Sequence, residues 1–144
     1  MTNSDWRPSA SLQILKKRAT LLRQIRTFFY AREVLEVDTP ALSVAGNTDP
    51  QIESFSVNYS GPGGSRKLYL HTSPEFPMKR LLASGTGAIY QLCKVFRNGE
   101  AGRKHNPEFT MLEWYQPGFN HHQLMNEVDE LIDEVLGQAD IPLR

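Results

Sequence analysis

Cysteine is almost absent from this sequence of 144 residues, because only Cys93 is present. One cysteine cannot form an internal disulfide, and no cluster of Cys and His residues has the spacing of a zinc site. Cys93 ends the largely apolar run 89–93, so we interpret it as a small buried side chain rather than a reactive thiol. A disulfide-stabilised scaffold and a zinc finger are therefore excluded.

An excess of charge of one sign is also missing. Lys+Arg and Asp+Glu both number 16, so the formal net charge is zero. Proteins whose main partner is nucleic acid are usually basic, because neutralising phosphates provides most of their affinity. The charge balance therefore counts against a dedicated RNA- or DNA-binding module, although a local basic patch stays open.

Long hydrophobic runs are absent as well. No stretch is long enough to cross a membrane, and residues 1–6 lack the basic-then-apolar order of a signal peptide. Hydrophobic residues make up 40% and charged residues 22%, which is ordinary for a soluble globular protein. We expect a cytoplasmic protein without a membrane partner, whose residues 1–144 belong to one domain.

Apolar residues at spacings of three and four predict amphipathic helices. We expect either Ser9 or Ser11 to be the N-cap of the first helix. Pro74 suits the start of the second helix and Gly85 its end, and Gly137 is expected to end the third. The predicted helices cover residues 11–31, 74–85 and 120–137.

Short stretches rich in β-branched and aromatic residues predict strands over residues 34–42, 52–57, 67–71, 89–97 and 108–116. Pro40 cannot donate a hydrogen bond to a neighbouring strand, so we place the first strand at an edge or an interface. Residues 60–65 are expected to join the second and third strands as a hairpin with a loose tip. The order of elements predicts an α+β fold with an antiparallel sheet flanked by helices.

Positive charge is concentrated in the loop between the last two predicted strands. The planar guanidinium group of an arginine can hold a phosphate through two parallel hydrogen bonds. Phe109 and Tyr115 on the following strand offer an aromatic surface on which a base could stack. The alternative is an exposed basic hairpin with core aromatics, and composition alone favours that alternative. The cations are Arg97, Arg103, Lys104 and His105.

An ordered pattern over residues 96–113 resembles motif 2 of the class II aminoacyl-tRNA synthetases. Phe96 and Arg97 match the Phe-Arg start of the motif, and a variable loop follows them. Residues 105–113 are similar to the lysyl-type enzymes of this class in particular. A match over this many ordered positions outweighs the compositional alternative.

Two other stretches resemble the same class in order and spacing. Residues 34–42, which include Pro40, resemble motif 1, the element that forms the dimer interface in that class. Residues 72–82 resemble the segment that binds the amino group of the amino-acid substrate. The resemblance extends from about Trp6 to Val135, which is nearly the whole chain.

Within the class, the sequence is most similar to paralogues of lysyl-tRNA synthetase that lysylate a protein, elongation factor P. Residues 6–11 stand directly before the first helix, without a preceding anticodon-binding barrel, and residues 73–82 and 113–115 also look like the paralogues. The resemblance implies ATP-dependent formation of a lysyl or β-lysyl adenylate and its transfer to a lysine of elongation factor P. Two alternatives stay open, a lysyl-tRNA synthetase fragment acting on tRNA and a non-catalytic nucleotide-binding or dimerising fragment.

The resemblance also implies roles for individual side chains. Arg97 would be catalytic, holding the α-phosphate of ATP and the substrate carboxylate while charge builds at phosphorus. Phe109 would stack on adenine, Glu75 would accept hydrogen bonds from the substrate's amino group, and Tyr115 would line the side-chain pocket. The implied ATP site comprises Arg97, Asn98, Gly99, Glu100, His105, Asn106 and Phe109. The implied amino-acid site comprises Ser73, Pro74, Glu75 and Tyr115.

Each of these assignments has a simpler structural alternative. Glu75 stands in the first turn of a predicted helix, where the helix dipole favours a carboxylate whatever its function. Tyr115 could be a core aromatic residue, and Glu113 could serve only to brace the hairpin. His121 and His122 precede the last helix, and we give them no catalytic role.

The sequence departs from the family pattern in two places. Gly99 stands where the family usually has a glutamate, and alternation along a strand would point the following Glu100 away from the nucleotide. Motif 3, with the arginine that grips the γ-phosphate, is not found, and neither are the Mg²⁺ ligands expected beside it. We therefore expect the N-terminal part of a catalytic domain that holds no metal ligands, dimerises through residues 34–42 and forms little adenylate alone.

Overall fold

The computed structural model describes residues 7–138, so Trp6, where the resemblance begins, lies outside the described residues. In this range the chain has three helices and two small sheets, which confirms the predicted α+β class. It forms two compact units, one from the segments up to Glu33 and from Gly118 onward, the other from Val34–Pro117. No helix in the described range has the length and apolar character needed to span a membrane.

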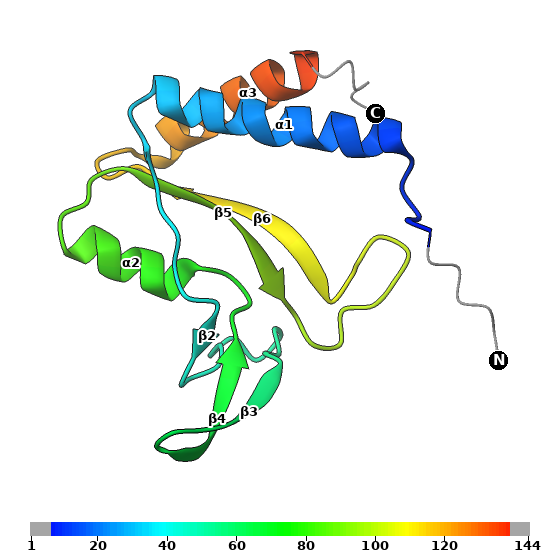
Figure 1. Cartoon of the computed structure of the whole chain (residues 1–144). Coiled ribbons are helices and arrows are strands. Elements are labelled where there is room, and N and C mark those ends of the chain that lie inside the picture. Colours follow the sequence, from blue (N-terminus) through cyan, green and yellow to red (C-terminus); the bar gives the residue numbers. More distant parts are fainter. Residues whose placement is uncertain (1–6, 139–144) are drawn as a thin grey trace. The chain divides into compact units, whose positions relative to one another are not determined.

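The first unit is a pair of packed helices, α1 (Leu12–Ala31) and α3 (His121–Gln138), which lie side by side in Figure 1. At the end of α1, Arg32 donates to the Phe28 carbonyl at 3.2 Å and to Glu130 of α3 at 3.0 Å. The guanidinium carbon of Arg32 also lies 3.5 Å from the centre of the Phe28 ring. The unit's buried apolar side chains are Ile25, Phe28, Phe29, Leu131 and Val135.

Both helices of this unit begin at side-chain caps. Ser11, rather than Ser9, is the N-cap of α1, and its Oγ accepts a hydrogen bond from the Ile14 amide at 3.3 Å. Before α3, the Asn120 side chain accepts from the Gln123 amide at 3.0 Å, and the Gln123 side chain accepts from the Asn120 amide at 2.9 Å. The predicted end at Gly137 is wrong, because α3 continues to Gln138.

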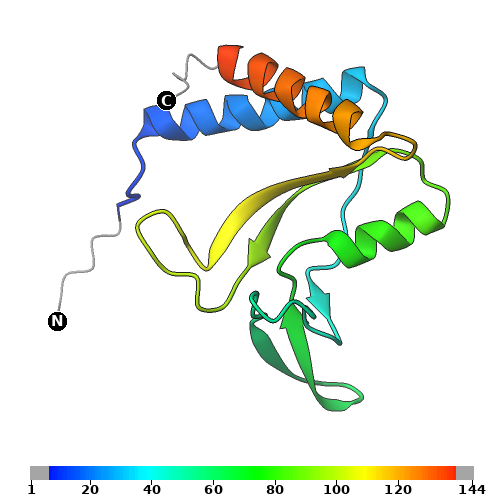
Figure 2. The same cartoon turned by 180° about the vertical axis from the view of Figure 1, so that it is seen from behind.

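The first sheet of the second unit has the order β1 (Leu35–Glu36), β5 (Ile89–Phe96), β6 (Glu108–Tyr115). The β5–β6 pairing is antiparallel as predicted, and Figure 2 shows its long connecting loop. The fully antiparallel sheet is wrong, because β1 pairs with β5 in parallel. The edge position of β1 is confirmed.

The predicted strand over residues 34–42 is divided between two sheets. Its start is β1, and its end forms β2 (Leu42–Ser43), which pairs with β4 of the second sheet. Pro40 lies in the extended segment between them, where its missing N–H cannot continue a ladder of hydrogen bonds. The prediction of one continuous strand over residues 34–42 is therefore wrong.

The second sheet has the order β2, β4 (Gly64–Leu70), β3 (Ser56–Gly61). The predicted loose tip is wrong, because Gly61 pairs with Gly64 and leaves only Pro62 and Gly63 in the turn. Gly63 has φ of 95°, so this Pro-Gly turn has the positive dihedral angle that a type II turn requires. Strand β3 also starts later than predicted, because residues 47–53 form a loop of hydrogen-bonded turns.

Helix α2 (Glu75–Ala83) starts after Pro74, and Gly85, with φ of 88°, follows its C-cap, as predicted. The segment just before α2 connects the two sheets of this unit. The His71 amide donates to the Ala41 carbonyl at 2.9 Å, and the His71 carbonyl accepts from the Phe96 amide at 3.0 Å. These bonds bring the start of α2 next to the end of β5, where the candidate site lies.

Candidate functional site

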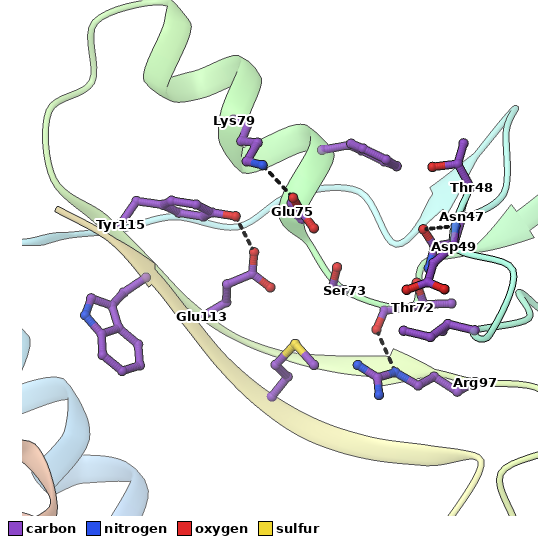
Figure 3. Close-up of a pocket in the computed structure, with 14 residues that line it drawn as sticks. Asn47, Thr48, Asp49, Thr72, Ser73, Glu75, Lys79, Arg97, Glu113 and Tyr115 are labelled. Carbon is purple, nitrogen blue, oxygen red and sulfur yellow. Dashed lines mark hydrogen bonds and ion pairs between the residues drawn. The ribbon is translucent and has the colours of Figure 1, made fainter. Parts of the chain in front are cut away.

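A cavity of about 830 Å³ opens in the second unit, between α2, the end of β5, β6 and the 47–52 loop (Figure 3). Met111, Glu113 and Tyr115 of β6 reach it because alternate residues of a strand face the same side. Its walls carry three carboxylates, on Asp49, Glu75 and Glu113, and two cations, on Lys79 and Arg97. The remaining lining residues are Asn47, Thr48, Ile52, Thr72, Ser73, Phe76, Met111, Trp114 and Tyr115.

One end of the cavity is formed by Glu113 and Tyr115 of β6. The Tyr115 hydroxyl donates to Glu113 Oε1 at 2.7 Å, and Figure 3 shows this pair facing Glu75 on α2. Burial raises the pKa of the Glu113 carboxyl, while the Tyr115 hydroxyl opposes that shift and the charge of Glu75 adds to it. Burial and the bond to Glu113 also raise the pKa of Tyr115, which keeps its hydroxyl protonated as a donor.

The first turn of α2 brings a further ion pair to this end of the cavity. The Lys79 ammonium lies 2.5 Å from Glu75 Oε1, a contact that spacing of four residues on a helix allows. Ser73 lines the cavity just before the helix, and Figure 3 places it between this ion pair and Arg97. A ligand with an ammonium group could bind here by replacing the Lys79 ammonium at Glu75.

Arg97 occupies the other end of the cavity. Its Nε donates to the Thr72 carbonyl at 3.3 Å, and its Nη1 lies 3.4 Å from Glu100 Oε1. Its guanidinium carbon is 5.2 Å from the centre of the Phe109 ring. The backbone amide of Arg97 donates to the Pro107 carbonyl at 2.9 Å, which closes the base of the 97–107 loop.

A second cavity of about 350 Å³ adjoins Arg97 on the side of this loop. Because Arg97 lines both cavities, a ligand in the second one would share its guanidinium group with a ligand in the first. Two cations and an aromatic ring in the second cavity suit a phosphorylated compound with a planar base. The lining residues are Arg97, Glu100, Lys104, His105, Asn106 and Phe109.

Most of the residues expected from the sequence come together at these cavities. Ser73, Glu75 and Tyr115 line the first, and Arg97, Glu100, His105, Asn106 and Phe109 line the second. Alternation along a strand does not apply to Glu100, since β5 ends at Phe96 and Gly99 turns the backbone with φ of 79°. Three expected residues line neither cavity: Pro74, which is buried at the start of α2, Asn98 and Gly99.

Asp49 and Lys79 of the first cavity received no role from the sequence, and Glu113 was considered only as a brace. A signal for Glu113 was present, because it stands two residues before Tyr115 on the same strand and therefore shares its face. Lys79 stands four residues after Glu75, which places it on the same side of α2. Asp49 lies in an irregular loop, and no periodic pattern could have assigned its position.

No group of three or more His, Cys, Asp or Glu side chains that could hold a metal ion occurs among residues 7–138. The carboxylates of Glu75 and Glu113 face each other, but Lys79 neutralises one and the Tyr115 hydroxyl caps the other. Both carboxylates are therefore already engaged by side chains of the same cavity.

Comparison with known proteins identifies the family. The chain is 62% identical over 138 residues to the elongation factor P–(R)-β-lysine ligase of Vibrio cholerae, covering 94% of this chain and 43% of that protein. It is 59% identical over 136 residues to the protein of the same name from Photobacterium profundum, covering 93% of this chain and 42% of that protein. It is 60% identical over 141 residues to the one from Pseudoalteromonas translucida, covering 96% of this chain and 44% of that protein.

These matches confirm the expected similarity to a lysyl-tRNA synthetase paralogue, and the chain spans about two fifths of the relatives' length. The family described as tRNA synthetases class II (D, K and N) matches residues 3–141. With a match over nearly its whole length, this chain belongs to the class II tRNA synthetases of the D, K and N type.

Proposed function

We propose that this chain forms the ATP- and amino-acid-binding part of a ligase that activates lysine or β-lysine and transfers it to elongation factor P. The observation that carries the proposal is that Arg97 lines two cavities, one with an acidic far end and one with cations and an aromatic ring. An adenylate of a diamino acid has matching chemistry, with ammonium groups, an anionic phosphate and a planar base. The names of the relatives, elongation factor P–(R)-β-lysine ligases, agree with this substrate and this acceptor.

In the proposed first step, an oxygen of the amino-acid carboxylate attacks the α-phosphorus of ATP, and the bond from that phosphorus to pyrophosphate breaks. Arg97 would contact both the carboxylate and the α-phosphate, because it lies where the two cavities meet. Its fixed positive charge would stabilise the negative charge that develops on the phosphorus oxygens. Phe109 lies beside the Arg97 side chain and would stack on the adenine ring.

The acidic end of the first cavity would select the amino acid. Lysine and β-lysine each carry two ammonium groups, and Glu75 and Glu113 offer one carboxylate for each. Glu113 would bind the ammonium of the side chain, with Tyr115 holding its carboxylate in place. An added cation would also favour the ionised form of Glu113, whose pKa burial raises.

In the proposed second step, an uncharged lysine amine of elongation factor P attacks the acyl carbonyl, an amide bond forms and AMP leaves. Mg²⁺ would accompany the ATP, with ligands outside the described residues, and we assign none of it to this chain. Since the reaction consumes ATP and modifies a translation factor, we place it in the cytoplasm. Residues 34–42 and 96–113 would correspond to motifs 1 and 2.

The selectivity of the first cavity gives a direct test. Binding to this chain is measured by calorimetry for non-hydrolysable lysyl and norleucyl adenylate analogues, which differ only in the terminal ammonium group. We expect the lysyl analogue to bind at least about tenfold more tightly, because a charge-assisted hydrogen bond is lost without the ammonium. Glu113→Gln should remove this preference.

The matched control is Glu108→Gln, on the same strand but paired with Lys94 at 3.0 Å and absent from the lining of the first cavity. It should leave the preference intact. Equal binding of both analogues by the unaltered chain would reject the proposed amino-acid site.

The alternative acceptor is tRNA, which the family name permits. A protein that contains this sequence and has the length of the curated relatives would be given ATP, labelled β-lysine and either elongation factor P or tRNA. We expect label on elongation factor P, and label on tRNA alone would favour the alternative.

A further inference from the structure

The side chain of Asn98, next to the arginine shared by both cavities, is bonded to a distant part of the chain. Its Nδ2 donates to Glu53 Oε1 at 2.9 Å, and its backbone amide donates to the Glu53 carbonyl at 2.8 Å. These two bonds join the end of β5 to the loop that precedes β3. Asn98 therefore lines neither cavity, and its amide group is engaged away from them.

The Glu53–Asn98 pair connects two parts of the site. On one side, Asn98 directly follows Arg97. On the other, Glu53 directly follows the 47–52 loop, which contributes Asn47, Thr48, Asp49 and Ile52 to the wall of the first cavity. The pair therefore fixes the position of the 47–52 loop relative to Arg97.

The other contacts of Arg97 join it to its own hairpin and to the segment before α2. In the hairpin, the Arg97 amide donates to the Pro107 carbonyl at 2.9 Å, and Arg97 Nη1 lies 3.4 Å from Glu100 Oε1. Its Nε bond to the Thr72 carbonyl and the Phe96 amide bond to the His71 carbonyl hold the strand end towards α2. Beyond Asn98 comes Gly99, with φ of 79° and open space around its α-carbon, so position 99 adds no packing contact of its own. The Glu53–Asn98 pair is thus the contact that ties the end of β5 at Arg97 to the 47–52 loop.

We propose that Glu53 and Asn98 are positioning residues, which set the geometry of Arg97 relative to the 47–52 wall and thereby the affinity for the nucleotide. This inference rests on the proposed function for its effect on ATP, but the placement of Arg97 is a property of the chain alone. Both side chains are exposed, and a surface hydrogen bond contributes little to overall stability. Their role is to set the position of Arg97, since a binding group must be held within about 0.5 Å of its productive position.

The test exchanges donor and acceptor within the pair. Asn98→Asp places a carboxylate opposite the Glu53 carboxylate, which replaces the side-chain hydrogen bond by a repulsion. Combining Asn98→Asp with Glu53→Gln lets the new glutamine donate to the new aspartate and restores a bond of the same length. Asn58→Asp is the matched control, on exposed strand β3 opposite Lys67 and outside both cavities.

The first readout needs no ligand, because it is the NMR signal of the Arg97 Nε–H, which is bonded to the Thr72 carbonyl. We expect Asn98→Asp to shift this signal and speed its exchange with water, the double substitution to restore it, and Asn58→Asp to leave it unchanged. An unchanged signal in Asn98→Asp, or no recovery in the double variant, overturns the proposal.

The second readout is the affinity for ATP. Asn98→Asp should weaken it about tenfold, and the double substitution should recover most of that loss, as expected for a charge-assisted bond. Unchanged ATP affinity in Asn98→Asp, when the unaltered chain binds ATP, overturns the positioning role and leaves the proposed function standing. If the unaltered chain binds neither ATP nor an adenylate analogue, the proposed function fails, and the Arg97 signal still decides whether the pair positions Arg97.

Discussion

At the scale of single residues, burial changes the acid–base properties of side chains on β5 and β6. Cys93 lies on β5 opposite Met111, and burial, followed by the charge of Glu113, raises its pKa to about 11. The thiolate is the reactive form of cysteine, so the same environment that keeps Cys93 protonated also keeps it unreactive. This agrees with the interpretation of Cys93 as a structural side chain, although it is only half-buried.

The rate at which Cys93 reacts with a thiol reagent tests this environment. At pH 8 only about a thousandth of the thiol would be ionised with a pKa of about 11. We expect alkylation at pH 8 to be on the order of a hundredfold slower than for a free model thiol, and to accelerate up to about pH 11. A reaction as fast as that of the model thiol would contradict the raised pKa.

Glu113 should make the stability of the chain depend on pH. Its folded-state pKa is raised, chiefly by burial, above the ordinary value of 4.5. Its contribution to stability is therefore fully present below about pH 4.5 and is lost as the pH rises through the folded-state pKa. Glu113→Gln removes this loss, so relative to the unaltered chain it should gain stability between about pH 4.5 and neutrality, by less than about 1 kcal/mol because the carboxyl is half-exposed.

Urea unfolding of both chains at several pH values measures this difference. The control is Glu108→Gln on the same strand, which should follow the unaltered chain in parallel. A difference that is constant with pH would mean that Glu113 titrates alike in the folded and unfolded states.

The sequence could indicate Arg97 and Glu75 because each stands in an ordered local pattern. It could not assign Asn98 its partner, because Glu53 lies in a loop 45 positions away in the chain. The spacing of four residues could place Lys79 beside Glu75, but not near Glu113, because that proximity depends on the tertiary placement of α2 and β6. Local patterns thus predicted the residue types of the site, and tertiary packing decided which of them meet.

At the scale of elements, the turn between β3 and β4 contains a glycine in a conformation that other residues rarely adopt. Gly63 has φ of 95°, and a side chain there would meet no atom within 4 Å, so a substitution acts through backbone conformation alone. We expect Gly63→Ala to destabilise the hairpin by about 1 kcal/mol. Faster amide exchange at Arg66, whose pairing with Tyr59 is a hydrogen-bonded one, would report this.

Gly102→Ala is the matched control, because Gly102 has open space around it and no positive φ. It should leave the exchange of the hairpin amides unchanged. Equal effects of both substitutions would show that the conformation of the Pro-Gly turn is not what limits the hairpin.

The reciprocal cap at the start of α3 should also contribute measurably. Asn120→Ala removes the bond to the Gln123 amide and should cost about 1 kcal/mol of stability. Asn126→Ala, at an exposed position inside α3, is the control and should be neutral or slightly stabilising, because alanine favours helix. A thermal unfolding midpoint that falls equally in both variants would contradict the capping role.

The helices could be predicted almost to the residue because caps and apolar spacing are local signals. The strand over residues 34–42 could not, because its division between two sheets depends on pairing with β5 and β4, far along the chain. The parallel pairing of β1 could not be predicted for the same reason, because its partner β5 lies far along the chain. For the 60–65 segment, glycine-rich composition suggested looseness, whereas pairing of the flanking strands leaves a two-residue turn.

At the scale of the whole molecule, we propose that the chain dimerises through the segment that resembles motif 1. Supporting this, two large apolar side chains of residues 34–42, Leu35 and Leu42, expose 53% and 47% of their surface. Sedimentation should give a dimer that dissociates on dilution, and Leu35→Glu combined with Leu42→Glu should give a monomer. Val57→Glu on β3 is the control, and a monomer already in the unaltered chain would contradict the proposal.

The most direct test of the central claim is calorimetric binding of a non-hydrolysable lysyl-adenylate analogue to the unaltered chain and to Arg97→Ala. The control is Arg66→Ala, because Arg66 lies over Tyr59 on the β3–β4 hairpin and lines neither cavity. We expect the unaltered chain and the control to bind alike and Arg97→Ala to bind on the order of a hundredfold more weakly, as expected for loss of a bidentate contact to phosphate. Undiminished binding by Arg97→Ala, or no binding by the unaltered chain, would contradict the claim that Arg97 is the centre of an adenylate site in residues 34–117.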